Sequence, residues 1–180
     1  MNQLFRFGLI LGIICLVATL VLAVTYEVTR PKIEKVLASE EAAALKAILP
    51  GADSFTEKSS DGIEYFEAYK SGSLAGYCVR VTASGYNGYI RIVVGVDTGG
   101  VIKGVEVLEQ SETPGLGAKI SEILPGENEP FFLRQFKGKQ ARTVAVKKDI
   151  DAITGATISR AAVTDAIRET VNKFFQKVRR

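Results

Sequence analysis

The 180-residue sequence contains no histidine and no tryptophan, and it has only two cysteines. Without histidine the chain cannot supply a Ser-His-Asp triad, an imidazole general base, or a histidine-ligated zinc or haem. Cys15 and Cys78 lie far apart in the sequence and cannot ligate an iron–sulfur cluster by themselves. These absences exclude many enzyme classes, and we expect no metal site and no catalytic residue in this chain.

The sequence also lacks a strong charge of one sign. Its 23 basic side chains offset 20 acidic ones, which leaves a net charge of +3. Nucleic-acid-binding domains usually concentrate their basic residues, often with aromatic residues among them, and no such block occurs here. Nucleic acid is therefore not an expected partner.

One long segment, residues 7–26, carries no charge and is rich in Leu, Ile, Val and Ala. At a rise of about 1.5 Å per residue, a helix of this length crosses a hydrocarbon core of roughly 30 Å. A cleaved signal peptide would have a shorter apolar region, about 7–15 residues, and a small-x-small cleavage site. The segment therefore predicts an uncleaved membrane anchor after a short tail, residues 1–6. The flanking Lys and Arg residues do not decide its orientation.

The remaining patterns predict an α+β domain over residues 51–180, an antiparallel sheet packed by helices and preceded by one transmembrane helix. Apolar spacing predicts a juxtamembrane helix over residues 27–50, in which Pro31 suits a first helical position. Alternation and turn residues predict strands, and helical periodicity predicts a closing helix with one apolar stripe. The predicted strands are 63–69, 77–83, 89–96, 101–109 and 143–146. A short helix is predicted over residues 118–124. After it, the side chains of Phe131, Phe132, Leu133 and Phe136 are predicted to pack in the core.

The two faces of the second predicted strand differ in character. Tyr77 and every second residue to Ala83 share one face, and Cys78 shares the other face with Arg80. Cys78 is therefore predicted to be a small packing residue of the sheet.

Residues 151–159, with the sequence DAITGATIS, lie between a predicted strand and the closing helix. Free backbone N–H groups and the positive end of the helix dipole converge at such a position, which binds phosphate readily. Gly155 and Ala156 leave the hydroxyl of Thr157 accessible. Ordinary helix capping is the alternative interpretation, with Thr154, Thr157 or Ser159 accepting from a first-turn amide and Asp151 favouring the dipole.

Two further glycine-bearing loops precede this segment. Residues 112–117, with the sequence ETPGLG, combine a fixed bend at Pro114 with two glycines, so they form either a tight turn or flat backbone against a planar ligand. Residues 85–88, with the sequence GYNG, form a hairpin loop with Tyr86 at its edge.

Taken together, these segments resemble the FMN-binding domain family. They occur in the order anchor, GYxG, ETPGLG and D-x-x-T-G-A-T-x-S, and the last motif precedes a final helix. The resemblance is strongest to the G subunits of Rnf ion-translocating ferredoxin:NAD oxidoreductase complexes. It implies one FMN per chain, moved from FAD by a separate flavin transferase and held as a phosphoester on Thr157. The chain has no histidine to activate that hydroxyl, which fits attachment by another protein. The implied cofactor-binding residues are Thr157, Asp151, Thr154, Gly155, Ala156, Ser159, Glu112, Thr113, Pro114, Gly115, Leu116, Gly117 and Tyr86.

The resemblance further implies an electron carrier that transforms no substrate of its own. Its implied place is the bacterial inner (cytoplasmic) membrane, with a periplasmic or otherwise extracytoplasmic domain, and its implied partners are membrane subunits carrying flavin or iron–sulfur centres. Coupling to Na⁺ or H⁺ movement is expected in those partners, because the span has no charged residue. Two alternatives are the flavin subunit of a sodium-pumping NADH:quinone reductase, whose chain is generally longer, and a flavin-free anchored scaffold subunit.

Overall fold

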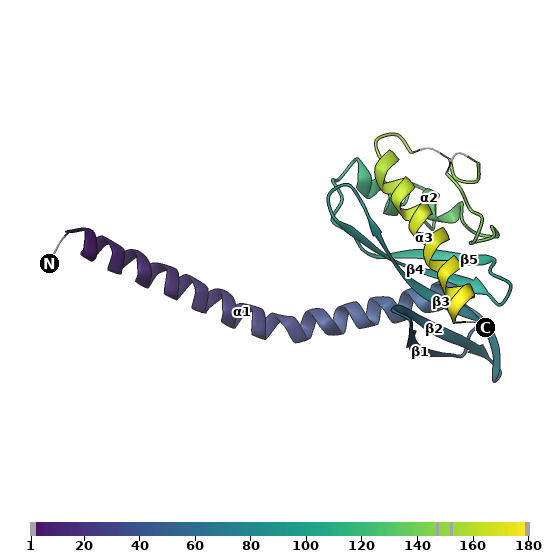
Figure 1. Ribbon diagram of the computed structural model, residues 1–180, viewed down its shortest axis with the longest axis horizontal. Helices are drawn as coiled ribbons and strands as arrows, with labels where there is room; N and C mark the ends of the chain where they lie inside the picture. The colour runs from purple at the N-terminus through teal and green to yellow at the C-terminus, as the bar shows by residue number, and fades with distance from the viewer. Residues whose placement is uncertain (1–2, 147, 152, 179–180) are drawn as a thin grey trace. The chain divides into compact units, whose positions relative to one another are not determined.

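The computed structural model describes residues 3–146, 148–151 and 153–178, and the chain divides into two compact units, Met1–Glu40 and Glu41–Arg180 (Figure 1). The first unit is helical, and the second combines a five-stranded antiparallel sheet with helices. The predicted α+β class, with an apolar helix before the sheet, is confirmed.

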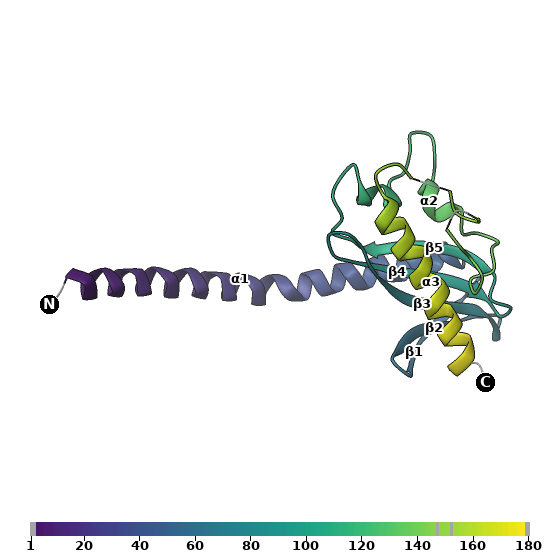
Figure 2. The same ribbon diagram turned by 45° about the horizontal axis from the view of Figure 1, so that its top comes forward.

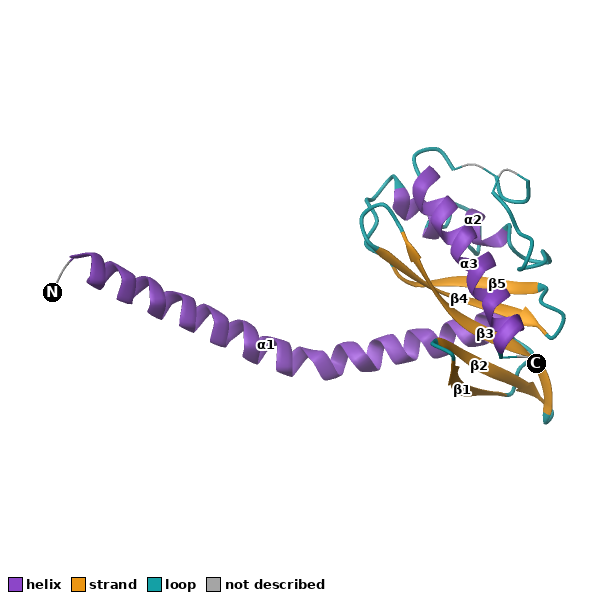
Figure 3. Cartoon of the chain, viewed as in Figure 1, coloured by secondary structure: helices purple, strands orange, loops and turns teal. Residues whose placement is uncertain are grey.

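The first element, α1 (Gln3–Ile48), is one continuous helix through both helical segments predicted from the sequence (Figure 3). At about 1.5 Å per residue its 46 residues extend roughly 70 Å, more than twice a hydrocarbon core. Its apolar part is long enough to cross a membrane, and none of that window is buried. Pro31 lies inside the helix and not at a first position, because the segments on both sides of it are helical. Residues 1–2 of the predicted tail lie outside the described residues.

The five strands pair in chain order, each antiparallel to the next (Figure 2). Four of them follow the predicted patterns, with boundaries shifted by a few residues. The strands are β1 (Ser54–Ser60), β2 (Ile63–Lys70), β3 (Ser73–Ser84), β4 (Tyr89–Asp97) and β5 (Ile102–Glu109).

Two strand predictions differ from the structure. The edge strand β1 was not predicted, because its sequence SFTEKSS is polar and its side chains are mostly exposed. The predicted strand at residues 143–146 is irregular, and Val146 makes only an isolated bridge with Ile150. The reason is local, because the N–H of Ala145 donates to the Asp149 carboxylate at 3.0 Å, which favours a turn over a sheet ladder.

One face of the sheet packs against α3 (Thr157–Lys177), the closing helix. The alternation predicted for β3 is confirmed, since Tyr77, Val79, Val81 and Ala83 belong to this core. Phe174 of α3 lies edge-on to two tyrosine rings, with centroid distances of 5.0 Å to Tyr65 and 4.9 Å to Tyr77. The buried stripe of α3 therefore fixes the helix across the sheet, and its first turn lies at one end of that stripe.

The other face of the sheet packs against the last turns of α1. Phe66, Cys78 and Val93 form a second buried cluster with Leu45 and Ile48. Burial raises the pKa of the Cys78 thiol to about 12, so this cysteine is a packing residue and not a reactive one.

Arg80 lies on that same face, as the alternation predicted. Its guanidinium bonds Glu41 of α1 at 2.6 and 2.8 Å, and it also pairs with Glu57 of β1 and Glu64 of β2. The hydrogen bonds to Glu41 are the largest cause of the raised pKa of Arg80. This cluster ties the end of α1 to the sheet.

Two short helices connect β5 to the last part of the chain. The predicted helix at 118–124 is the 3-10 helix η1 (Gly117–Ser121), and α2 spans Phe131–Arg134. Phe132, Leu133 and Phe136 are buried as predicted, whereas Phe131 is exposed beneath the guanidinium of Arg134.

Candidate functional site

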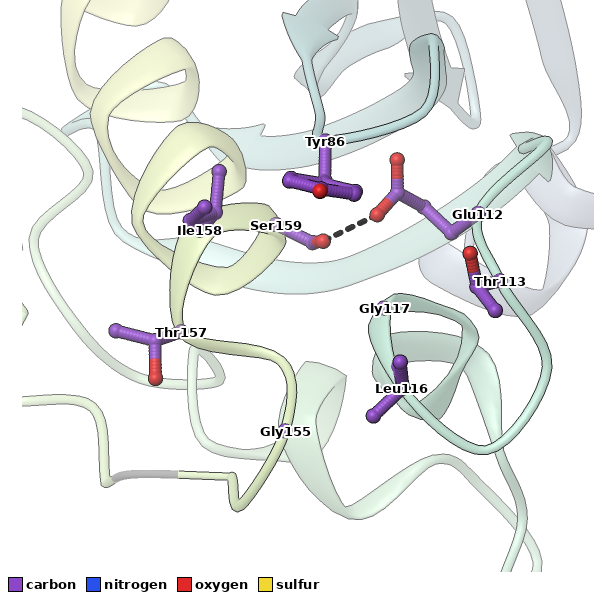
Figure 4. A pocket seen from close by; sticks show the side chains of 9 residues that line it. All are labelled: Tyr86, Glu112, Thr113, Leu116, Gly117, Gly155, Thr157, Ile158 and Ser159. Carbon is purple, nitrogen blue, oxygen red and sulfur yellow. Dashed lines mark hydrogen bonds between the residues drawn. The ribbon is translucent and has the colours of Figure 1, made fainter.

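A pocket of about 300 Å³ lies at the beginning of α3 (Figure 4). It is formed by three segments that are far apart in the sequence: the β3–β4 loop, the loop after β5, and the turn that leads into α3. This volume is at the lower end of the range typical of small-molecule sites. The lining residues are Tyr86, Glu112, Thr113, Leu116, Gly117, Gly155, Thr157, Ile158 and Ser159.

Among the described residues, no side chain caps the first turn of α3. Ala156 precedes the helix, makes no side-chain capping hydrogen bond, and no acidic residue occurs in the first turn. Thr157 is the first helical residue and its side chain is exposed. The capping interpretation of this motif is therefore wrong, and the positive end of the helix dipole is open to an external anion.

A buried carboxylate joins the three segments. The hydroxyl of Ser159, itself 1% exposed, donates to Oε2 of Glu112, which is 5% exposed. The other carboxylate oxygen, Oε1, accepts from the backbone N–H of Asn87 at 2.9 Å. Because a buried carboxylate is stable only when donors satisfy it, these two bonds hold the β3–β4 loop, the Glu112 loop and α3 together.

Glycines allow this close approach. A Cβ atom added to Gly117 would lie 2.0 Å from Oε2 of Glu112 and 2.6 Å from the hydroxyl oxygen of Ser159. Gly155 has a φ of +85°, and a Cβ atom there would lie 3.0 Å from a methyl group of Leu116. The two motif loops are therefore in contact with each other, which the sequence alone did not show.

The structure separates the predicted site residues into two groups. Tyr86, Glu112, Thr113, Leu116, Gly117, Gly155, Thr157 and Ser159 line the pocket, and Ile158 joins them although it was not predicted. The remaining predicted residues, Pro114, Gly115, Asp151, Thr154 and Ala156, lie on the same loops but do not line it. The only signal for Ile158 was its place between two motif residues.

The residues off the pocket have other contacts or are exposed. Asp151 is exposed, and its backbone N–H donates to the side chain of Gln135 at 2.7 Å. The carbonyl of Thr154 accepts from the ammonium group of Lys119 at 3.2 Å. These bonds hold the loop before α3 next to η1 and α2.

The lining indicates a site for an organic molecule with one anionic end. Tyr86, Leu116 and Ile158 are large, exposed apolar or aromatic side chains at the pocket. Across the described ranges, no group of three or more His, Cys, Asp or Glu side chains could hold a metal ion.

Comparison with known proteins identifies the class of this domain. Residues 85–172 match the FMN-binding domain, a range that contains the whole pocket lining, and residues 1–48 match the RnfG N-terminal region. A crystal structure of the C subunit of the Na(+)-translocating NADH-quinone reductase from Parabacteroides distasonis has a similar fold, with a TM-score of 0.51 and 25% identity. That likeness covers 63% of this chain and 61% of the other. The fold and the pocket therefore define an FMN-binding domain.

Whole-chain relatives then identify the family. The chain is 32% identical to the G subunit of the Na(+)-translocating ferredoxin:NAD(+) oxidoreductase complex of Acetobacterium woodii, over 94% of this chain and 91% of that protein. It is 35% identical to the G subunit of an ion-translocating oxidoreductase complex of Haemophilus influenzae, over 92% of this chain and 87% of that protein. The chain belongs to the family of G subunits of Rnf-type ion-translocating oxidoreductase complexes, and the resemblance inferred from its motifs is confirmed.

Proposed function

We propose that this chain is a membrane-anchored electron carrier with one FMN joined through its phosphate to the hydroxyl of Thr157. The observation that carries the proposal is the position of Thr157, exposed at the uncapped beginning of α3 and beside the pocket of an FMN-binding domain. When bound, FMN supplies reversible transfer of one or two electrons. The chain itself transforms no substrate in this proposal.

The residues present fit such a group. The first-turn amides of α3 stabilise the negative charge of a phosphate, because they have no intrahelical acceptor. Tyr86, Leu116 and Ile158 would supply packing surface for an aromatic ring, because all three line the pocket. Gly117 and Gly155 let the loops approach each other closely, because a side chain at either position would meet Glu112, Ser159 or Leu116. Glu112 and Ser159 hold those loops in place, and the Glu112 carboxylate accepts from the Ser159 hydroxyl and the backbone N–H of Asn87.

Attachment requires another protein. In the reaction implied by the family resemblance, the oxygen of Thr157 attacks the phosphorus of the FMN half of FAD, the phosphoanhydride bond breaks, AMP leaves, and the hydroxyl proton is released. Thr157 has no hydrogen-bonded base among the described residues, and the chain contains no histidine. We therefore assign activation to a separate flavin transferase, which approaches the exposed loop containing Asp151 and Thr154.

The proposed place of the protein is an Rnf-type complex of the bacterial cytoplasmic membrane. Electrons pass between ferredoxin and NAD through subunits that carry flavin or iron–sulfur centres, and this transfer is coupled to movement of Na⁺ or H⁺. The part of α1 that crosses the membrane has no charged residue between Arg6 and Glu27, so ion movement belongs to the partner subunits. We propose that the domain lies on the periplasmic or otherwise extracytoplasmic side.

The flavin subunit of a sodium-pumping NADH:quinone reductase is the second candidate, favoured by the fold shared with the Parabacteroides distasonis protein. The relatives named above match over about nine-tenths of the chain, and residues 1–48 match the RnfG N-terminal region, which favours the Rnf assignment.

Mass spectrometry of protein purified from its native host tests the proposal. We expect a mass increase of one FMN less one water, on the peptide that contains Thr157. The variant Thr157→Ala should lose this increase and the flavin fluorescence of the denatured chain, while its circular dichroism stays unchanged. Thr113→Ala is the matched control, because Thr113 is another exposed threonine of the same pocket and should leave the label in place. A label that persists on Thr157→Ala, or native protein without any label, would refute the proposal.

A further inference from the structure

Arg160 is a buried arginine in the first turns of α3, three residues after Thr157. It is only 4% exposed, and its Nε atom is buried without a hydrogen-bond partner. Its guanidinium forms no ion pair with any described residue, and the residues outside the described ranges carry no acidic side chain. Burying a charge without a counter-ion is unfavourable, so this side chain lacks a partner that its environment requires.

The other partly buried arginines of the domain show what such a partner looks like. Arg80 bonds three carboxylates, and Arg168, on the same helix as Arg160, bonds Asp165 at 2.6 Å and a backbone carbonyl at 3.3 Å. Glu112 does not pair with Arg160, because the oxygens of its carboxylate accept hydrogen bonds from Ser159 and Asn87. Among the described residues, Arg160 alone combines burial with an unpaired guanidinium Nε.

The position of Arg160 indicates where its missing anion belongs. Residues three apart are neighbours on a helix surface, with Cβ atoms roughly 5–6 Å apart, so Arg160 is adjacent to Thr157. Helical side chains lean toward the N-terminus, which directs the stem of Arg160 back along the first turn. Arg160 is also, with Ser159, at the beginning of the buried stripe that continues through Val163 and Ile167. This direction would bring its charge toward the uncapped end of α3.

We propose that Arg160 is the counter-charge of the phosphoryl group carried by Thr157. This inference rests on the proposed attachment of FMN and adds a residue that the motif does not contain. A phosphodiester keeps one negative charge at neutral pH, and it would pair with the guanidinium through charge-assisted hydrogen bonds. Attachment then converts an unpaired buried cation into a paired one, so the flavin stabilises the fold through Arg160.

Thermal unfolding of the full-length chain in detergent, with and without attached flavin, tests the inference. In the wild-type chain we expect attachment to raise Tm by roughly 3–10 °C. In Arg160→Met, Tm of the flavin-free form should stay unchanged or rise, because an unpaired charge is removed, and the rise on attachment should be lost. Arg168→Met is the matched control on the same helix. It should lower Tm of the flavin-free and the flavin-bearing forms equally, so that the rise in Tm on attachment is kept.

Three outcomes separate this inference from the proposed function. A wild-type chain without the FMN mass would refute attachment itself. Attached flavin with the same Tm rise in Arg160→Met as in wild type, or an equal loss of Tm in both forms of that variant, would refute only the role of Arg160.

A charge-conserving variant keeps the test decisive if Arg160→Met takes up no flavin. Arg160→Lys should then accept FMN, show part of the Tm rise, and shift the ³¹P resonance of the attached phosphate relative to wild type. An Arg160→Lys chain that accepts FMN with an unshifted ³¹P resonance and no Tm rise overturns the proposal, and so does failure of Arg160→Lys to accept FMN.

Discussion

Replacing Gly117 by alanine is the sharpest test of how the pocket is built. The added Cβ atom would lie 2.0 Å from Oε2 of Glu112 and 2.6 Å from the hydroxyl oxygen of Ser159, both well below a van der Waals contact. Neither neighbour can yield freely, because both are buried and bonded to each other. The variant therefore has to move the loop or break the Glu112–Ser159 bond.

The expected loss follows from these contacts. Overpacking a close-packed site costs about 1–3 kcal/mol, and weakening a buried hydrogen bond to a charged group costs about 1.5–3 kcal/mol. Because one displacement relieves part of both effects, we expect the free energy of unfolding to fall by about 3–5 kcal/mol. Gly51→Ala is the matched control, since its Cβ atom would meet only the flexible end of Lys70 at 3.5 Å, and it should change the free energy by less than about 0.5 kcal/mol.

Urea unfolding followed by circular dichroism gives both values. A double-variant cycle with Glu112→Ala adds a second check, because removing the carboxylate removes the atom that the new methyl group strikes. The losses of Gly117→Ala and Glu112→Ala should then sum to more than the loss of the double variant. A Gly117→Ala chain as stable as Gly51→Ala, or strictly additive losses, would show that the close contact does not constrain this site.

Two further predictions concern the α1–sheet cluster and the side of the membrane. Arg80→Met should lower the free energy of unfolding, measured in urea, by about 1–2 kcal/mol, because it leaves the Glu41 carboxylate unpaired. Arg91→Met breaks only an exposed pair and should lower it by less than about 0.5 kcal/mol. Equal losses in the two variants would contradict this reasoning. In the variant Ser59→Cys, a membrane-impermeant maleimide should label the exposed position 59 in intact cells. Cys78 of the wild-type chain should stay unlabelled, because burial raises the pKa of its thiol to about 12. Labelling of position 59 only after permeabilisation would place the domain on the cytoplasmic side.

The predictions from the sequence were accurate where local pattern decides structure. The alternation in β3 revealed its two faces, and the spacing of Val163, Ile167 and Val171 is that of a helix with one buried side. The predictions were wrong where contacts with another segment of the chain decide the local structure. The polar strand β1 is held by its register with β2, and the turn at Asp149 replaced a strand that β-propensity favoured.

The sequence by itself determined the apolar span, the positions of four of the strands and the position of Thr157 at the beginning of a helix. Each of these depends on hydrocarbon thickness, side-chain alternation or the conformational preferences of short motifs, which act over a few residues. Only the tertiary structure decided that Ser159 meets a carboxylate 47 positions away, that Leu116 touches Gly155, and that Arg160 is buried without a partner. These contacts join segments distant in the chain, and they depend on how the sheet and α3 pack.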